Sequence, residues 1–424
     1  SFDGRETAPA AASADRFVLG GARTRNFQGY LQRVGSGRSV GVPGLVRMLE
    51  LAHARHGRLA WPRLFAPAIR VAEEGFAMSP RLAQLIARDP LLKGNDAARA
   101  LYFLADGSPK PAGTLLRNPE LAAVFKRIAY EGPVAFYEGD IAREIVAAVA
   151  AQRLPGDMTM ADVAAYRARE RPALCAPYRG YKVCGVGPPS SGGATVGMLL
   201  GLLERFPMGT LKPLSADAIH LFAEAGKLAY ADRDYYLADP DFVPQPLAQL
   251  LDRGYLRARS GTIRMAKANE RPRHGEVKLP GMARHGEDQT LELPSTSHVS
   301  VVDDGGNAVA FTTSVESAFG SRIMVRGFLL NNQLTDFSWQ PDVDGLPAAN
   351  RVAGGKRPRS SMSPTIVFDA QGRLRHVVGS PGGQQIINYV ALTLVALLDW
   401  KLGAQQALDL PRYGGGTRGT NLER

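Results

Sequence analysis

Apolar residues recur at helical spacing through the first two hundred positions of this 424-residue chain. This spacing places them on one face of a helix, and it predicts helices over residues 46–56, 61–73, 119–129, 140–152 and 194–205, with a short one around 162–164. Ser215 is a favoured N-cap residue, so a long helix is predicted to begin there and to run to Tyr236.

Beyond residue 296 the apolar pattern becomes that of strands. Residues 299–302 and 308–313 flank a polar turn and predict a β-hairpin, and residues 365–368 and 374–378 predict a second one. The longest apolar run, Ile386–Leu398, is too short to span a bilayer and predicts a buried helix. Helices first, then hairpins, then a helix suggest sheets that lie between helical layers.

Residues 261–294 separate these two parts and are rich in charged residues, Gly and Pro, with few apolar positions. Such a composition predicts a flexible linker on the surface. The linker ends where Thr296 opens the strand pattern. A threonine in this position can be freed by cleavage on its upstream side. Its hydroxyl then becomes a nucleophile, and its new α-amine is a built-in base.

The composition is that of an ordinary globular protein, with 45% hydrophobic and 21% charged residues. The net charge is +11, but the arginines are scattered and few aromatic residues lie among them. This pattern favours a generally basic surface over a nucleic-acid-binding protein. We find no glycine-rich phosphate loop, and His53 with His56 is more typical of a solvent-facing helix than of a metal site. Neither a metal nor a cofactor is predicted.

The two cysteines, Cys175 and Cys184, flank a predicted two-residue turn at Arg179 and Gly180. This turn places the cysteines directly opposite each other, with Cα atoms about 4.5 Å apart. A disulfide accepts that separation, and it would fit an oxidising compartment. A reduced, buried pair is the alternative, and the sequence does not decide between the two.

The chain resembles the γ-glutamyltranspeptidase family. The segment 296–303, Thr-Ser-His-Val-Ser-Val-Val-Asp, is similar to the segment that opens the small subunit of these enzymes. Similar motifs follow each other in order along nearly the whole chain, at 2–9, 188–193, 230–233, 239–242, 319–321, 329–338, 356–365 and 379–383.

The resemblance implies an α+β fold, the four-layer αββα sandwich of the N-terminal-nucleophile hydrolases. It also implies that a precursor cuts itself between Ser295 and Thr296. Residues 1–295 would then form the large subunit and residues 296–424 the small one, as a heterodimer within one αββα domain. The family has further chain at both ends, so the resemblance implies that this sequence is truncated before Arg5 and after Arg412.

The resemblance also assigns the site residues. Thr296 is the nucleophile, Ser314 supports it, and the backbone amides of Gly382 and Gly383 form the oxyanion hole, in which each donor can be worth about 3 kcal/mol of barrier. The resemblance also implies that Arg5, Ser360 and Ser361 bind the α-carboxylate of a γ-glutamyl substrate. It implies that Asp336 binds the α-ammonium group, with Gln333 and Glu316 at neighbouring substrate positions.

The chemistry is physically reasonable because an α-amine has a pKa near 7.7–8.0, which suits proton transfer near pH 7. The chain departs from the common bacterial pattern in having Ser314 in place of threonine and Glu316 in place of asparagine. The segment 338–356 is also short and lacks the tyrosine-bearing lid of some members.

The implied activity is a glutathione hydrolase or γ-glutamyltransferase that uses no cofactor and passes the γ-glutamyl group from Thr296 to water, an amino acid or a peptide. The family resemblance implies a periplasmic or secreted protein. One alternative is a glutaryl or cephalosporin acylase of the same fold, although a glutaryl group would offer no positive charge to Asp336 and Glu316. The other is a catalytically inactive relative that acts by binding.

Overall fold

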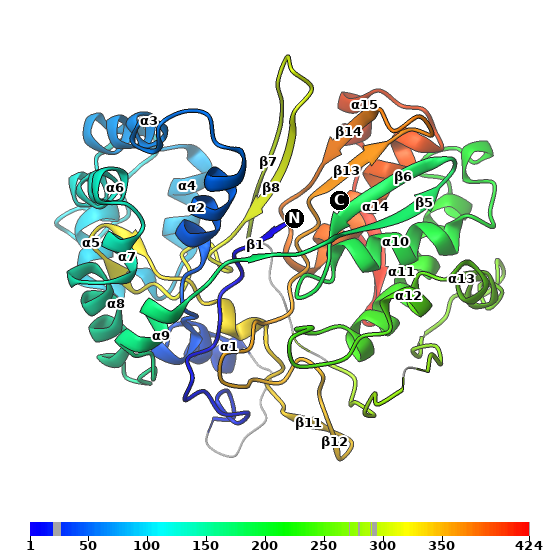
Figure 1. The fold of residues 1–424 in the computed structure, drawn as a ribbon, viewed down its shortest axis with the longest axis horizontal. Helices are drawn as coiled ribbons and strands as arrows, with labels where there is room; N and C mark the ends of the chain where they lie inside the picture. Colours follow the sequence, from blue (N-terminus) through cyan, green and yellow to red (C-terminus); the bar gives the residue numbers. More distant parts are fainter. Residues whose placement is uncertain (20–26, 271, 279, 289, 291–294, 424) are drawn as a thin grey trace.

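The computed structural model describes residues 1–423 except 20–26, 271, 279, 289 and 291–294. Figure 1 shows two halves side by side, one helical and one in which a sheet packs on helices. This mixture confirms the predicted α+β class. The helices of the first half are α1 (Phe27–Val34), α2 (Leu45–His56), α3 (Trp61–Glu74), α4 (Pro80–Arg88), α5 (Asp96–Tyr102), α6 (Pro119–Glu131), α7 (Val134–Tyr137), α8 (Asp140–Ala150) and α9 (Met160–Ala165).

Local signals explain where these helices begin. Asn118 caps α6 through its side chain, and Pro119 occupies the first turn, where its missing N–H costs nothing. Ser79 and Pro80 do the same for α4. The predicted helices over 46–56, 61–73, 119–129 and 140–152 are confirmed within two residues as α2, α3, α6 and α8, while α4 and α5 were not predicted.

The second half contains an antiparallel sheet of four strands in the order β14-β13-β6-β5. It joins the hairpin β5 (Ala173–Tyr178) and β6 (Tyr181–Val186) to the later hairpin β13 (Thr365–Phe368) and β14 (Leu374–Val378). Three helices pack with it around one buried core, namely α10 (Gly192–Leu203), α11 (Ala216–Tyr236) and α14 (Ile386–Leu398). Ser215 caps α11 as predicted.

Helix α14 confirms the predicted buried helix, because nearly every residue of it is buried. Within the described part of the chain, no helix has both the length and the apolar character that a membrane crossing requires.

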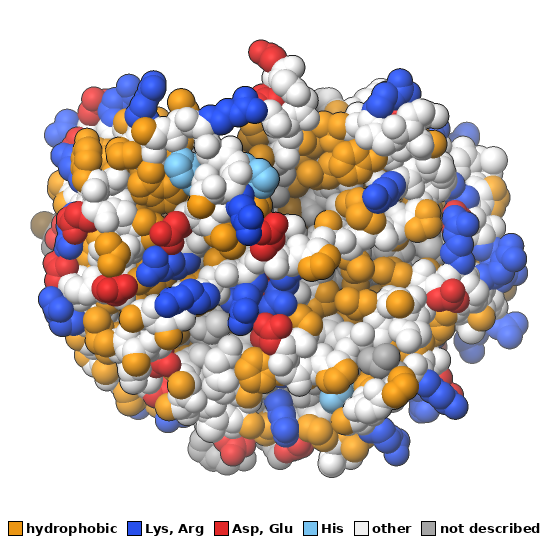
Figure 2. Space-filling model, in the orientation of Figure 1, with side chains coloured by type: hydrophobic (Ala, Val, Ile, Leu, Met, Phe, Trp, Pro, Cys, Tyr) orange, Lys and Arg blue, Asp and Glu red, His pale blue; other side chains and the backbone are white. Residues whose placement is uncertain are grey.

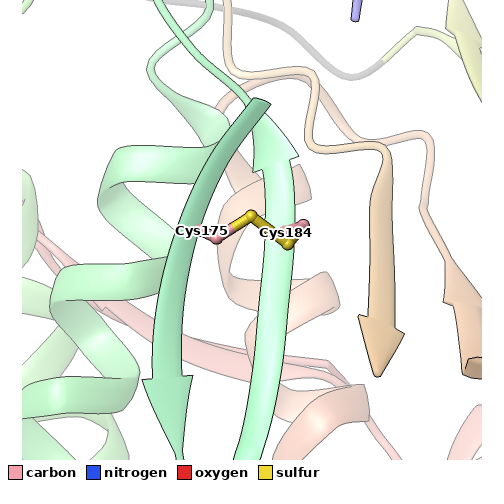
Figure 3. The surroundings of a disulfide bond; sticks show 2 residues. All are labelled: Cys175 and Cys184. Atoms are coloured by element: carbon pink, nitrogen blue, oxygen red, sulfur yellow. A yellow bond between two sulfur atoms is a disulfide. The ribbon is translucent and has the colours of Figure 1, made fainter. Parts of the chain in front are cut away.

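Cys175 and Cys184 form a disulfide in this structure (Figure 3). The two residues are directly paired in the β5–β6 register, and their Cα atoms lie 4.0 Å apart. Arg179 and Gly180 both have positive φ, 49° and 83°. These angles are typical of the tight turn that the sequence predicts. Of the two states that the sequence left open, the structure therefore has the oxidised one.

The strands β7 (Ser297–Val302) and β8 (Ala308–Thr313) form a separate two-stranded sheet that projects beyond both halves (Figure 1). Its base contacts β13 and β14, and Ser300 donates a hydrogen bond to the Val377 carbonyl. Val299, Val301 and Val302 are each about half exposed. The predicted hairpin is thus confirmed, and it presents apolar side chains to solvent.

The remaining strands form short pairs, and the remaining helices lie around the second half. These elements are the pairs β1 (Phe2–Asp3) with β4 (Arg169–Glu170), β2 (Phe76–Ala77) with β3 (Leu115–Leu116), β9 (Met324–Val325) with β10 (Phe328–Leu329), β11 (Asp342–Val343) with β12 (Leu346–Pro347) and β15 (Tyr413–Gly416) with β16 (Gly419–Leu422), and the helices α12 (Leu247–Leu250), α13 (Arg253–Ser260) and α15 (Ala404–Asp409).

Described residues of the predicted linker 261–294 contact this second half; the N–H of Gly275, for example, donates to Asp232 on α11. His285, Asp288 and Thr290 are buried within the linker, so at least this part of the segment is packed against the body. Residues 271, 279, 289 and 291–294 of the predicted linker lie outside the described residues.

Candidate active site

One pocket brings together nearly all the residues that the sequence predicts for the site. They come from segments far apart in the chain and from both sides of the predicted cleavage point. The pocket is lined by Arg5, Ser295, Thr296, Ser314, Glu316, Gln333, Asp336, Ser360, Ser361, Met362, Gly383 and Ile386.

The carbonyl oxygen of Ser295 accepts two hydroxyl hydrogen bonds. The Thr296 hydroxyl donates to it at 2.6 Å, and the Ser314 hydroxyl donates at 2.8 Å. In the uncut chain, the predicted nucleophile therefore lies against the carbonyl that it is expected to attack. Hydrogen bonds to the oxygen draw electron density from the carbonyl carbon, which favours addition of the Thr296 oxygen.

Glu316 follows Ser314 at the end of β8 and has a positive φ of 74°, which is rare for a residue with a side chain. Its backbone N–H donates to the Ser314 hydroxyl oxygen at 2.8 Å. The Glu316 carboxylate is buried and accepts hydrogen bonds from Ser317 and Asn332. These contacts fix the strained backbone, and they also place a carboxylate at the pocket wall.

Arg5 and Asp336 form a buried ion pair in the same pocket, with Nη2 and Oδ2 2.5 Å apart. Arg5 also donates to the backbone carbonyls of Pro358 and Arg359, each at 3.0 Å. These carbonyls help to hold the guanidinium group in place. The pocket thus offers both a fixed cation and a fixed anion.

Three further predicted residues lie on the pocket wall. Gln333 is in the 3₁₀ turn Gln333–Asp336, and its buried Oε1 has no hydrogen-bond partner among the described residues. Ser360 and Ser361 are both 3% exposed. The Ser360 carbonyl accepts hydrogen bonds from the N–H and the hydroxyl of Ser191. Arg233 donates to the Ser361 hydroxyl at 2.6 Å, so this serine is held in one orientation.

Gly382 and Gly383 form the turn that precedes α14. Their φ values are 140° and 55°, in the region that favours glycine. A Cβ at Gly382 would lie 2.8 Å from the Tyr389 ring. Gly383 lines the pocket, whereas Gly382 is not among its lining residues. The turn therefore places backbone rather than side chains at this edge of the pocket.

Two lining residues, Met362 and Ile386, were not predicted as part of the site. Ser191 and Arg233 were likewise seen only as parts of family motifs, although they position Ser360 and Ser361. A serine next to a turn and a buried arginine on a helix are common, so only the folded arrangement distinguishes them. His298 is outside the lining set and hydrogen bonds to Thr312 and Ser300.

Burial raises the pKa of Glu6 to about 7, although Arg5 beside it opposes the shift. The Arg5 Nη1 atom lies 3.9 Å from this carboxyl group. Burial, together with the Glu316 carboxylate, also raises the pKa of Tyr30. The surroundings of the pocket are thus poor in water, and charges within them interact strongly.

Comparison with known proteins agrees with this geometry. The family model for gamma-glutamyltranspeptidase matches residues 1–423. The glutathione hydrolase proenzyme of Pseudomonas sp. (strain A14) is 37% identical over 426 residues, covering 97% of this chain and 70% of that protein. The acylase ACY 1 proenzyme of Pseudomonas sp. (strain SE83) is 34% identical, with shares of 97% and 71%. The cephalosporin acylase of Bacillus halodurans, at 24% identity, has the same fold, with a TM-score of 0.81 over 97% of this chain and 72% of that one. The chain therefore belongs to the γ-glutamyltranspeptidase family, as its ordered motifs predict.

Proposed function

We propose that the protein is a γ-glutamyl hydrolase or transferase that cleaves the γ-glutamyl amide of glutathione and related compounds. The observation that carries this proposal is the presence of Thr296, Arg5 and Asp336 in one pocket. A hydroxyl nucleophile, a fixed cation and a fixed anion match the reactive carbonyl, the α-carboxylate and the α-ammonium of a γ-glutamyl group. Family membership supports the same activity.

The reaction begins with self-cleavage. The Thr296 oxygen adds to the Ser295 carbonyl carbon as the hydroxyl loses its proton. The C–N bond then breaks, and its nitrogen takes up a proton and leaves as the new α-amine of Thr296. Ser314 donates to the carbonyl oxygen while this oxygen gains negative charge. Water then hydrolyses the resulting ester. The products are two fragments, residues 1–295 and 296–424, which remain together as a heterodimer.

The freed Thr296 then acts on substrate. Its α-amine takes the hydroxyl proton as the oxygen attacks the γ-carbonyl carbon, and the backbone amides of Gly382 and Gly383 stabilise the oxyanion. The proton passes to the leaving amine as the amide bond breaks. Water or the amine of an amino acid or peptide removes the γ-glutamyl group from Thr296 in the second step.

The Arg5–Asp336 pair explains how a doubly charged group enters a buried site. The substrate's α-carboxylate takes the place of Asp336 on Arg5, and its α-ammonium then bonds to Asp336. Each protein charge keeps an opposite partner throughout, so no unpaired charge is left buried. The orphaned Oε1 of Gln333 is a further acceptor for the ammonium, and Ser360 and Ser361 are hydroxyl partners for the carboxylate.

A glutaryl or cephalosporin acylase is the rival function within the family. A glutaryl group has the γ-carbonyl and the carboxylate but no ammonium, so it would bring no positive charge of its own to Asp336 and Glu316. We therefore favour the γ-glutamyl substrate. We also propose, from family membership and the disulfide, that the protein works in the periplasm or outside the cell.

Two measurements test the proposal on protein expressed from the complete gene. On a denaturing gel, the wild-type protein should give two bands and Thr296→Ala one. The wild-type protein should then hydrolyse a γ-glutamyl anilide faster than the glutaryl anilide of the same leaving group. A single wild-type band would support the inactive relative, and faster cleavage of the glutaryl compound would support the acylase.

A further inference from the structure

A buried ion pair connects the segment before the cleavage point to the pocket. Asp288 is seven positions upstream of Ser295, and its Oδ2 atom lies 2.8 Å from the Nη2 atom of Arg359. Both side chains are 1% exposed. Asn350 and Thr290 also donate to the Asp288 carboxylate, at 3.0 Å and 2.6 Å. The carboxylate is thus completely surrounded by partners.

Charge explains why this contact is strong. Burial by itself would raise the pKa of Asp288, but Arg359, with the hydrogen bonds from Thr290 and Asn350, brings it below its ordinary value. Asp288 is therefore ionised in the folded protein. Arg359 has one other carboxylate close by, Asp234, at 3.3 Å. Its Nη1 atom also donates to the backbone carbonyls of Arg233 and Leu237 at a longer 3.4 Å, and its buried Nε atom has no hydrogen-bond partner among the described residues. The two carboxylates are therefore the closest contacts of this guanidinium group.

Arg359 in turn holds Arg5. The backbone carbonyl of Arg359 accepts from Arg5 Nη2, and the carbonyl of the preceding Pro358 accepts from Arg5 Nε. The backbone N–H of Arg359 donates to Asn350, which also donates to the Asp336 carbonyl. A shift of Arg359 would therefore move the carbonyls that orient the Arg5 guanidinium.

We propose that Asp288 is a positioning residue that acts through Arg359 to hold Arg5 in the orientation that binds the substrate's α-carboxylate. The inference rests on the proposed function and deepens it. Asp288 and Arg5 belong to the predicted fragment 1–295, whereas Arg359 belongs to 296–424. The carboxylate end of the pocket is therefore completed across the two fragments, and the end of the first fragment remains part of it after self-cleavage.

The test compares two anilides that share a leaving group. The γ-glutamyl anilide carries the α-carboxylate, and the 4-aminobutyryl anilide is the same acyl group without it. Asp288→Asn keeps the size of the side chain but removes its charge. We expect this variant to raise the KM for the γ-glutamyl anilide about tenfold and to change the KM for the 4-aminobutyryl anilide less than twofold, with kcat retained for both.

Asp89→Asn is the matched control. Asp89 and Arg322 form an equally close buried ion pair, with 2.8 Å between Oδ2 and Nη2, outside the pocket lining. The control should leave the ratio of the two KM values unchanged, even where it lowers the temperature of unfolding. A general loss of stability would move both variants alike.

Arg359→Lys provides a second measurement in case Asp288→Asn does not fold. It keeps the positive charge opposite Asp288 but loses the planar fork, and we expect the KM ratio to rise about threefold. The inference would be overturned if the KM for the γ-glutamyl anilide, divided by that for the 4-aminobutyryl anilide, were the same in the Asp288 and Arg359 variants as in the wild type or the Asp89 control. A wild-type enzyme that cleaves neither anilide would instead refute the proposed function, so the two failures are distinguishable.

Discussion

The Ser314 hydroxyl donates its proton to the carbonyl oxygen of Ser295, and the direction of this hydrogen bond is fixed. The backbone N–H of Glu316 donates to the same Ser314 oxygen, which leaves the Ser314 proton to point to Ser295 at 2.8 Å. The N–H of Glu316, a residue with a positive φ, thus orients a donor at the bond that is expected to break.

Replacement of this donor should slow self-cleavage. In Ser314→Ala the developing oxyanion loses one hydrogen bond, which is typically worth about a hundredfold or more in rate. Ser314→Thr keeps the hydroxyl and should cleave at close to the wild-type rate. A time course on denaturing gels measures both. Cleavage of the alanine variant at the wild-type rate would show that the contact has no part in the reaction.

Asp336→Asn should remove the preference for γ-glutamyl over glutaryl substrates. The amide cannot balance the α-ammonium, and it removes the negative charge that lies 2.5 Å from Arg5. The ratio of kcat/KM for the two anilides should fall at least tenfold, because a hydrogen bond to a charged group contributes about 1.5–3 kcal/mol. An unchanged ratio would refute the assignment of Asp336 to the ammonium.

Stability should depend on pH through Glu6. Burial raises its pKa from an ordinary value of 4.5 to about 7 in the folded protein. The folded state therefore binds the proton more tightly than the unfolded chain. The contribution of this group to the free energy of unfolding is therefore complete below about pH 4.5. This contribution falls as pH rises from about 4.5 to about 7, and it does not change further above pH 7. The total loss of unfolding free energy across this window is on the order of 3 kcal/mol.

Glu6→Gln should remove this dependence, since the amide does not titrate. Denaturant unfolding of the variant and the wild type, measured from pH 4.5 to 8, should give curves whose difference changes across that window. Glu138→Gln is a control at an exposed side chain that is 57% accessible. Curves for Glu6→Gln that run parallel to those of the wild type would show that burial does not perturb this carboxyl group.

The disulfide should stabilise the β5–β6 hairpin by a modest amount. Its sequence separation is 9, and closure of a loop of roughly ten residues is worth about 2–3 kcal/mol on the chain-entropy argument. The double variant with serine at Cys175 and Cys184 should lose that much unfolding free energy. Reductant should destabilise only the wild-type protein. An equal response of the two proteins to reductant would contradict the bond.

Much of this molecule could be predicted where the signal is local. The turn at Arg179 and Gly180 depends on two adjacent residues, and it predicted that the two cysteines lie opposite each other, although not that they form a disulfide. The N-cap at Ser215 and the buried helix α14 were also predicted from local patterns. Most of the predicted site residues belong to ordered motifs, with Ser314 and Glu316 as exceptions. The structure brings all the predicted site residues to one pocket except Gly382, which precedes the lining residue Gly383.

Other features depend on contacts that no local pattern encodes. Asp288 was assigned only to a polar linker, because its partner Arg359 is 71 residues away in the chain. The unpartnered Oε1 of Gln333 and the two acceptors around Arg5 are likewise properties of the folded pocket. Helices α4 and α5 have only 9 and 7 residues, and isolated helices this short are marginal in water. Packing of Ile86 and Ala98 into one buried apolar cluster stabilises them.

The half-exposed valines of β7 and β8 have a consequence for handling the 424-residue chain. Within the described residues this sheet has only two strands, so each has one edge with unsatisfied backbone donors and acceptors. Apolar ribbons with open edges recruit further strands from other molecules. Asp303 and Asp304 in the turn between the two strands oppose such stacking through charge repulsion, and Figure 2 shows acidic side chains in red at the tip of this hairpin. Concentrated samples should therefore self-associate more readily as salt screens these two carboxylates.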